Sequence, residues 1–343
     1  MHPKKIRYSI LELAAISEGK SIQDTLKDSL NLAQKAEDLG YERFWLAEHH
    51  NAHNIASSAT SVLIGYIAGG TSRIRVGSGG VMLPNHSPLI IAEQFGTLAR
   101  LYPNRIDLGL GRAPGTDQET AHAIRPDRMH SVYRFPEEVS QILEYMSEDN
   151  QDARVRVPIA EGLNVPAYIL GSSTDSARVA AKLGLPYAFA SHFATAYLFE
   201  ALNIYHTDFQ PSQYLKEPYT IAGINVFAAE TDTEAERLST TLIRMFLGIF
   251  TGQRQYLQPP VDMTADLREI AAMPAVHQML KYTFSGSRET VKRMTEDFLQ
   301  QTKVDELIVV SSIYDHLDRI KSYEIFSDVM QEIANESQLT SAR

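Results

Sequence analysis

Apolar and polar residues form two alternating kinds of segment along most of the chain. Short, mainly apolar runs rich in β-forming residues are separated by longer segments in which apolar residues recur every three or four positions. The short runs are typical of strands covered on both faces, as in a parallel sheet, and the longer segments are typical of amphipathic helices. The predicted strands are Arg7–Leu13, Arg43–Ala47, Ile74–Leu83, Ile106–Leu110, Ala167–Leu170, Tyr187–Ala190, Tyr219–Ala228 and Glu306–Ile313.

Several of the predicted helices have recognisable ends. Ser21 and Asp24 form a capping box, and Gly40 ends the helix that follows it. Two long amphipathic helices are predicted over Asp232–Phe250 and Asp315–Ile333. A strand is therefore followed by a helix almost throughout the chain.

This order of elements is compatible with an open doubly wound sheet or with a closed (β/α)8 barrel. Eight predicted strands favour the barrel, and we expect residues 1–343 to form a single α/β domain of the TIM-barrel type. A plain barrel needs about 250 residues. The surplus is assigned to two insertions, residues 113–166 after the fourth strand and 251–285 after the seventh helix. Residues 334–343 are polar and are expected to form a frayed tail.

The composition excludes several classes of function. The 343 residues include 42 Asp and Glu against 32 Lys and Arg, a net charge of −10, with no basic cluster of the kind that binds nucleic acid. The chain has no cysteine, which excludes disulfides, thiolate nucleophiles and cysteine-ligated metals. It has no apolar run as long as a membrane span and no apolar segment of a signal peptide near its start. We therefore expect a soluble, cytoplasmic protein.

The first candidate chemistry lies at the end of the second strand, because barrel enzymes place their active sites at the carboxyl ends of the strands. Glu48, His49 and His50 stand there, with His53 shortly after. Acid–base chemistry, hydrogen-bonded loop histidines and a zinc, iron or nickel site are all possible roles for such residues. No second His/Asp pair with ligand spacing accompanies them, so no metal is expected.

Further candidates stand at the ends of the next three strands. Gly79 and Gly80 interrupt the third strand, and glycine inside a strand marks a bulge or a close approach of another group to the backbone. An arginine and the start of a helix follow the fourth and fifth strands, and together they are typical of a phosphate site. The residues of this predicted phosphate site are Arg112, Ser172, Ser173 and Ser176.

With these motifs in place, the chain resembles the bacterial luciferase-like family of flavin-dependent monooxygenases. It most resembles an uncharacterised branch with the motifs Ala-Glu-His-His and Gly-Gly-Val-Met-Leu-Pro-Asn-His, here residues 47–50 and 79–86. The resemblance extends from about residue 11 to residue 316, and the run 98–115 is highly specific. A (β/α)8 barrel is the fold that this resemblance implies.

The resemblance also implies roles for the candidate residues. His49 matches the catalytic histidine beside the flavin ring, and Gly79-Gly80 matches a dipeptide that forms a cis peptide bond beneath the isoalloxazine. Arg112 matches the arginine that binds the flavin phosphate, with Ser172, Ser173 and Ser176 beside it. Two positions depart from true luciferases. Gly111 stands where they have a reactive cysteine and Ser172 where they have an acidic residue, which argues against light emission from an aldehyde.

The implied reaction uses reduced FMN and dioxygen to oxygenate a small organic substrate. No NAD(P) motif is present, so a separate flavin reductase is expected to supply the reduced flavin. Residues 251–285 are expected to close over the site as a lid. A deazaflavin-dependent dehydrogenase or reductase, a metal-dependent hydrolase using His49, His50 and His53, and a flavin-storing protein are the alternatives.

A homodimer is the expected assembly. Barrels of this family commonly pair through the helices that follow the second and third strands, here Ser58–Gly69 and Leu89–Leu101. The second helix is more apolar than one inward face requires, at Ile90, Ile91, Phe95, Leu98 and Leu101. The alternative is a monomer in which residues 113–166 fold back over this helix.

Overall fold

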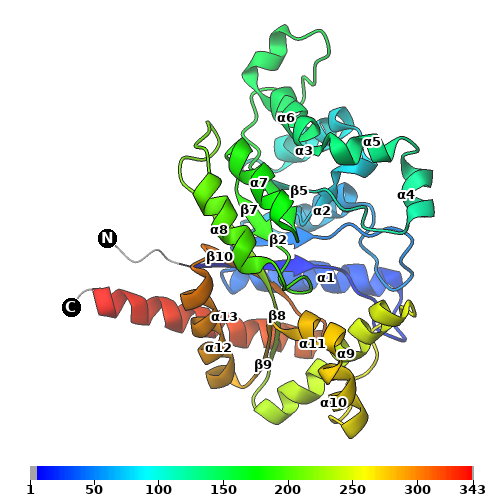
Figure 1. Cartoon of the computed structure of the whole chain (residues 1–343), viewed down its shortest axis with the longest axis vertical. Coiled ribbons are helices and arrows are strands. Elements are labelled where there is room, and N and C mark those ends of the chain that lie inside the picture. The colour runs from blue at the N-terminus through cyan, green and yellow to red at the C-terminus, as the bar shows by residue number, and fades with distance from the viewer. Residues whose placement is uncertain (1–5, 342–343) are drawn as a thin grey trace.

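The computed structural model of the chain describes residues 6–341 and shows a closed parallel barrel surrounded by helices (Figure 1). The strands are hydrogen-bonded in the order β10-β1-β2-β3-β5-β6-β7-β8, and pairing of β10 with β8 closes the ring. The prediction of a (β/α)8 TIM barrel is therefore confirmed. The barrel strands are β1 (Arg7–Glu12), β2 (Arg43–Leu46), β3 (Arg75–Ser78), β5 (Ile106–Gly111), β6 (Ala167–Gly171), β7 (Tyr187–Phe189), β8 (Thr220–Ala228) and β10 (Glu306–Val310).

Two short strands, β4 (Val81–Met82) and β9 (Thr283–Gly286), extend the sheet at the carboxyl end of the barrel. β4 pairs with β5 beyond the end of β3, and β9 pairs with β8 beyond the end of β10. The prediction of one continuous strand over Ile74–Leu83 is therefore wrong, since the cis peptide bond between Gly79 and Gly80 separates β3 from β4. β9, which is not one of the eight barrel strands, begins within the predicted insertion 251–285.

The helices cover the outside of the barrel. They are α1 (Ile22–Asp38), α2 (Thr60–Gly69), α3 (Pro88–Leu101), α6 (Phe135–Met146), α7 (Thr174–Leu183), α8 (Leu198–Asp208), α9 (Asp232–Thr251), α12 (Arg288–Thr302) and α13 (His316–Ser341). The Ser21 side chain caps α1 at the Asp24 N–H, as the capping box predicts. Ala334 and the following residues to Ser341, where a frayed tail is predicted, continue α13. Residues 342–343 lie outside the described part of the chain.

The predicted insertions contain further helices: α4 (Gln118–Ile124), α5 (Arg128–Tyr133), α10 (Ala265–Ala272) and α11 (Pro274–Leu280), with a 3-10 turn at Glu148–Asp152. Residues 113–166 are not wholly an excursion, because α6 packs on α3 in the outer layer and Ala160 contacts Gly96 of α3. Ile91, Phe95 and Leu98 are consequently buried, contrary to the prediction of an apolar surface there.

Alternation along each strand divides the core into an inner and an outer part. Outward residues such as Phe44, Leu108 and Ile224 pack beneath the helices. Inward residues fill the barrel, with Trp45 against Tyr168 at mid-height. Below them, the fully buried Arg43 bonds to Asp107 at 2.7 Å and to Glu306 at 2.8 Å. These charges close the amino-terminal end of the barrel.

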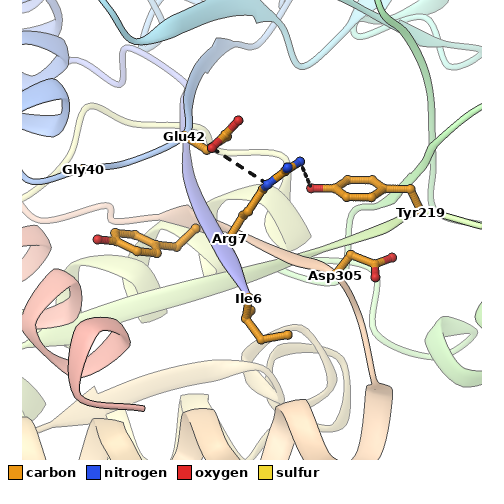
Figure 2. Close-up of a pocket in the computed structure, with 7 residues that line it drawn as sticks. Ile6, Arg7, Gly40, Glu42, Tyr219 and Asp305 are labelled. Atoms are coloured by element: carbon orange, nitrogen blue, oxygen red, sulfur yellow. Dashed lines mark hydrogen bonds and ion pairs between the residues drawn. The ribbon is translucent and has the colours of Figure 1, made fainter. Parts of the chain in front are cut away.

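A cavity of about 460 Å³ lies beneath this closed end, at the amino termini of β1, β8 and β10 (Figure 2). Arg7 crosses it, bonding to the Tyr219 hydroxyl at 3.3 Å and approaching Glu42 at 3.9 Å. The cavity faces away from the predicted site, and the ionised network separates the two. No helix among residues 6–341 is long and apolar enough to span a membrane.

Candidate active site

The carboxyl end of the barrel has a floor of small side chains. The inward residues nearest that end, by alternation and strand register, are Leu11, Ala47, Gly79, Gly111, Leu170, Ala190, Gly223 and Val310. Five of these eight are glycine or alanine, whereas the layers below contain tryptophan, tyrosine and arginine. These five positions therefore contribute no large side chain of their own to this layer. A Cβ added at Gly79 would lie 2.6 Å from Leu11 Cδ1, so packing also requires glycine there.

His49 lies at the rim of this floor, just after β2. Its backbone N–H donates to the Ser57 carbonyl at 3.0 Å. Burial lowers the pKa of His49, a hydrogen bond to the Gly115 carbonyl opposes this, and the Arg254 guanidinium lowers it further. The imidazole is therefore neutral at neutral pH, and it can accept a proton or a hydrogen bond.

The neighbouring Glu48 is the centre of a separate cluster. Its Oε1 is 2.9 Å from His50 Nε2 and 2.8 Å from His86 Nε2, and its Oε2 accepts from the Met82 N–H at 3.3 Å. Although burial alone would raise the pKa of Glu48, its hydrogen bonds to the two histidines lower it to about 2. The three side chains could hold a metal ion, since their ligand atoms lie within 4.8 Å of one another. His49 and His53 are not members of this group, and His53 instead packs on Tyr256 at 5.5 Å.

The carboxyl end of the barrel, above the floor, forms its mouth. The predicted phosphate residues lie on one side of this mouth. Arg112 Nη2 lies 3.4 Å from Asp175 Oδ2 in the first turn of α7. Ser173 is the N-cap of α7, and its own side chain makes no capping hydrogen bond. Ser172 is exposed beside it. Ser176 is buried, and its hydroxyl already bonds to the Ser173 carbonyl at 2.7 Å and to Tyr187 at 3.0 Å, so its side chain serves the loop.

A second histidine, which the sequence analysis missed, enters the mouth from the β7–α8 loop. His192 is only 9% exposed, and a Cβ on Gly223 would lie 2.5 Å from its Nδ1. Burial, followed by the charge of His49, lowers the pKa of His192 to about 4. His49 is therefore within electrostatic reach. The sequence around His192 gives no signal, because a lone histidine after a short strand has no recognisable spacing.

The start of the 251–285 segment lies across the loops after β1 and β2. Leu257 donates to the Ile16 carbonyl at 2.9 Å, and its own carbonyl accepts from the Glu18 N–H at 2.8 Å. Asn54 Nδ2 donates to the Gln255 carbonyl at 3.1 Å. These bonds hold the segment at the rim and bring Arg254 near His49.

Comparison with known proteins shows the family of the chain. The sequence profile of luciferase-like monooxygenases matches residues 6–326. A luciferase-like monooxygenase of Escherichia coli (strain K12) is 45% identical over 333 residues, covering 97% of this chain and 99% of that protein. An N-acetyl-S-alkylcysteine monooxygenase of Bacillus subtilis (strain 168) is 33% identical over 336 residues, covering 95% and 98%.

A solved structure supports the same assignment. The crystal structure of apo-MsnO8 is 35% identical to the chain, with a TM-score of 0.86, and the match covers 95% of this chain and 98% of that one. Fold and sequence agree over nearly the whole length. The chain belongs to the luciferase-like monooxygenase family, whose members act on small molecules with oxygen.

Proposed function

We propose that this enzyme binds reduced FMN in the mouth of the barrel and uses it with dioxygen to oxygenate a small organic substrate. The observation that carries this proposal is the floor of glycine and alanine beside a neutral histidine. A flat ring system fits on such a floor, since no large side chain projects from those five positions. When bound, FMN would supply the reduction of dioxygen and the transfer of one oxygen atom.

The residues beside the floor fit the rest of FMN. Arg112 and the uncapped start of α7 at Ser173 would hold the phosphate, because a guanidinium and free backbone N–H groups both bind such an anion. Gly79 and Gly80 would lie against the ring. Ser172 is free to donate its hydroxyl, whereas Ser176 would contribute through its backbone.

His49 would act as the acid–base residue of this site. Its lowered pKa keeps the ring neutral, so it can take up a proton from the bound substrate or orient it through a hydrogen bond. The insertion segment around Arg254 would exclude water from the reacting groups when the site is filled. That segment is the part of residues 251–285 to which we assign the role of a lid.

Two partners complete the proposal. A separate flavin reductase would supply the reduced flavin. A second copy of the chain would pack against α2 and α3, where Val62, Tyr66, Ile90 and Leu101 are exposed apolar side chains. Because the Bacillus subtilis relative is an N-acetyl-S-alkylcysteine monooxygenase, thioethers of that type are the first substrates to test.

Anaerobic titration with reduced FMN, followed by admission of oxygen and of a thioether, tests the function. We expect one FMN per chain, and oxygenated product formed only with flavin, oxygen and substrate together. A His49→Ala variant should keep its FMN affinity and lose product formation by roughly 100-fold, the scale of lost acid–base catalysis. Tight binding of the deazaflavin F420 with no binding of FMN would instead support the dehydrogenase alternative.

A further inference from the structure

His192 enters the barrel from the β7–α8 loop and packs over Gly223. Gly223 alternates with the inward residues Ile221 and Asn225 of β8, so its missing side chain would project into the barrel. His192 Nδ1 lies 2.5 Å from the position of that missing Cβ. The ring therefore fills the space above Gly223 and forms part of the floor.

The surrounding loop holds this histidine firmly by its backbone. Asn225 Nδ2 donates to the His192 carbonyl at 2.6 Å, and Ser191 Oγ donates to the Gly223 carbonyl at 2.7 Å. The Phe193 ring packs edge-on against the imidazole at 4.9 Å. The imidazole is thus fixed in place before any ligand binds.

One polar atom of this fixed ring has no partner. Among the residues that the structure describes, none hydrogen-bonds to the buried Nδ1 of His192. Buried polar atoms are nearly always hydrogen-bonded, and leaving one unpaired costs about 1–3 kcal/mol. Burial also keeps the imidazole neutral, so each ring nitrogen can serve as donor or acceptor, depending on the tautomer.

We propose that His192 is a binding residue for the flavin ring, hydrogen-bonding a polar atom of the isoalloxazine from the side of the mouth opposite Gly79. This inference rests on the proposed function. β7 is the neighbour of β6, so His192 follows the strand next to the one that leads to Ser173. A ligand with its phosphate at α7 and its ring on the floor therefore extends toward His192. Isoalloxazine carries carbonyl oxygens and ring nitrogens that match either tautomer.

Two variants and two ligands test the proposal. His192→Phe keeps an aromatic ring and removes the hydrogen bond, whereas His192→Gln keeps a polar side chain. We expect His192→Phe to weaken FMN and riboflavin equally, by tenfold or more, and His192→Gln to weaken both by less. The phosphate plays no part in this contact, so equal losses distinguish it from a defect at Arg112. Unchanged affinity of folded His192→Phe for both ligands would overturn the proposal.

An NMR measurement on the wild-type protein decides the matter if His192→Phe does not fold. With ¹⁵N-labelled histidine, riboflavin should shift the imidazole signals of His192 and leave those of the exposed His277 unmoved. Static His192 signals in riboflavin-saturated protein would contradict the proposed contact. Failure of the wild-type chain to bind any flavin would instead reject the proposed function, so the two outcomes are distinguishable.

Discussion

At the scale of single residues, Arg112 is the most direct test of the phosphate site. Its guanidinium is held loosely by Asp175 at the uncapped start of α7. We expect Arg112→Ala to weaken FMN binding by about 1.5–3 kcal/mol, the range for a hydrogen bond to a charged group. Riboflavin has no phosphate and should lose far less affinity. Calorimetric titration with both ligands measures the difference.

Asp175→Asn is the matched control for Arg112. It removes a negative charge from beside the predicted phosphate without removing the guanidinium. FMN affinity should therefore stay the same or increase in this variant. Equal losses of FMN and riboflavin affinity in Arg112→Ala would show that the phosphate lies elsewhere.

The burial of His192 predicts that the stability of the fold depends on pH. His192 has a pKa of about 4 in the folded protein, mainly because burial disfavours its charge, against about 6.5 when unfolded. The unfolded chain therefore binds more protons as the pH falls, and stability that is present above pH 6.5 is lost toward pH 4. The full contribution is on the order of 3 kcal/mol. Urea unfolding of the wild-type protein between pH 7.5 and 5 should show this loss.

His192→Gln should remove part of this pH dependence, and His277→Gln, at an exposed site, should leave it unchanged. Carboxylates such as Glu48, whose hydrogen bonds to His50 and His86 lower its pKa to about 2, contribute only below this window. The same slope in His192→Gln and wild type would show that His192 is not buried in its neutral form.

At the scale of elements, Glu48 joins the end of β2 to β4 through His50, His86 and the Met82 N–H. Each imidazole Nε2 lies within hydrogen-bond distance of the same carboxylate oxygen, so the buried charge is compensated without a metal. We expect elemental analysis of the purified protein to find no stoichiometric metal, and dialysis against EDTA to leave the thermal unfolding midpoint unchanged. One tightly bound ion per chain, removed together with stability, would contradict this.

Substitution of Gly96 by alanine tests the contact between α3 and the segment after α6, and the same substitution at Gly65 is the control. A Cβ at Gly96 would lie 2.7 Å from Ala160 Cβ and 2.9 Å from its Cα, so Gly96→Ala should destabilise the fold by about 1–3 kcal/mol. Gly65 in α2 has only Leu98 Cδ2 at 3.4 Å, and Gly65→Ala should stabilise by about 0.5–1 kcal/mol. Opposite signs in urea unfolding are the expected result.

The sequence predicts elements better than it predicts contacts between them. The eight barrel strands follow from apolar runs with clear ends, and six of them start at the predicted residue, including β1 at Arg7 and β10 at Glu306. β9 was missed because Thr283–Gly286 is four residues long and half polar. The pairing of Glu48 with His86 spans 38 positions, and nothing local to either residue indicates it.

At the scale of the whole molecule, the exposed apolar residues of α2 and α3 predict a dimer. Val62 is 68% exposed and Leu101 is 64% exposed on neighbouring helices, although α6 covers other parts of α3. A two-fold interface would cover this patch on both copies. Light scattering at micromolar concentration should give the mass of two chains, and Val62→Asp should give the mass of one.

Ile22→Asp is the control for this substitution. Ile22 is 59% exposed on α1 and lies outside the α2–α3 patch, so the charge introduced there should not change the mass. A wild-type mass of a single chain at the same concentration would refute the dimer.

The ionised network of Arg43, Asp107 and Glu306 has a consequence for the kinetics of ligand binding. Because it seals one end of the barrel, every molecule enters and leaves through the same opening. If FMN lies on the floor as proposed, with the organic substrate nearer the opening, FMN would bind before the substrate and leave after the product. Flavin exchange would then wait for release of the product above it, and saturating product should slow flavin dissociation without competing for the flavin's own contacts.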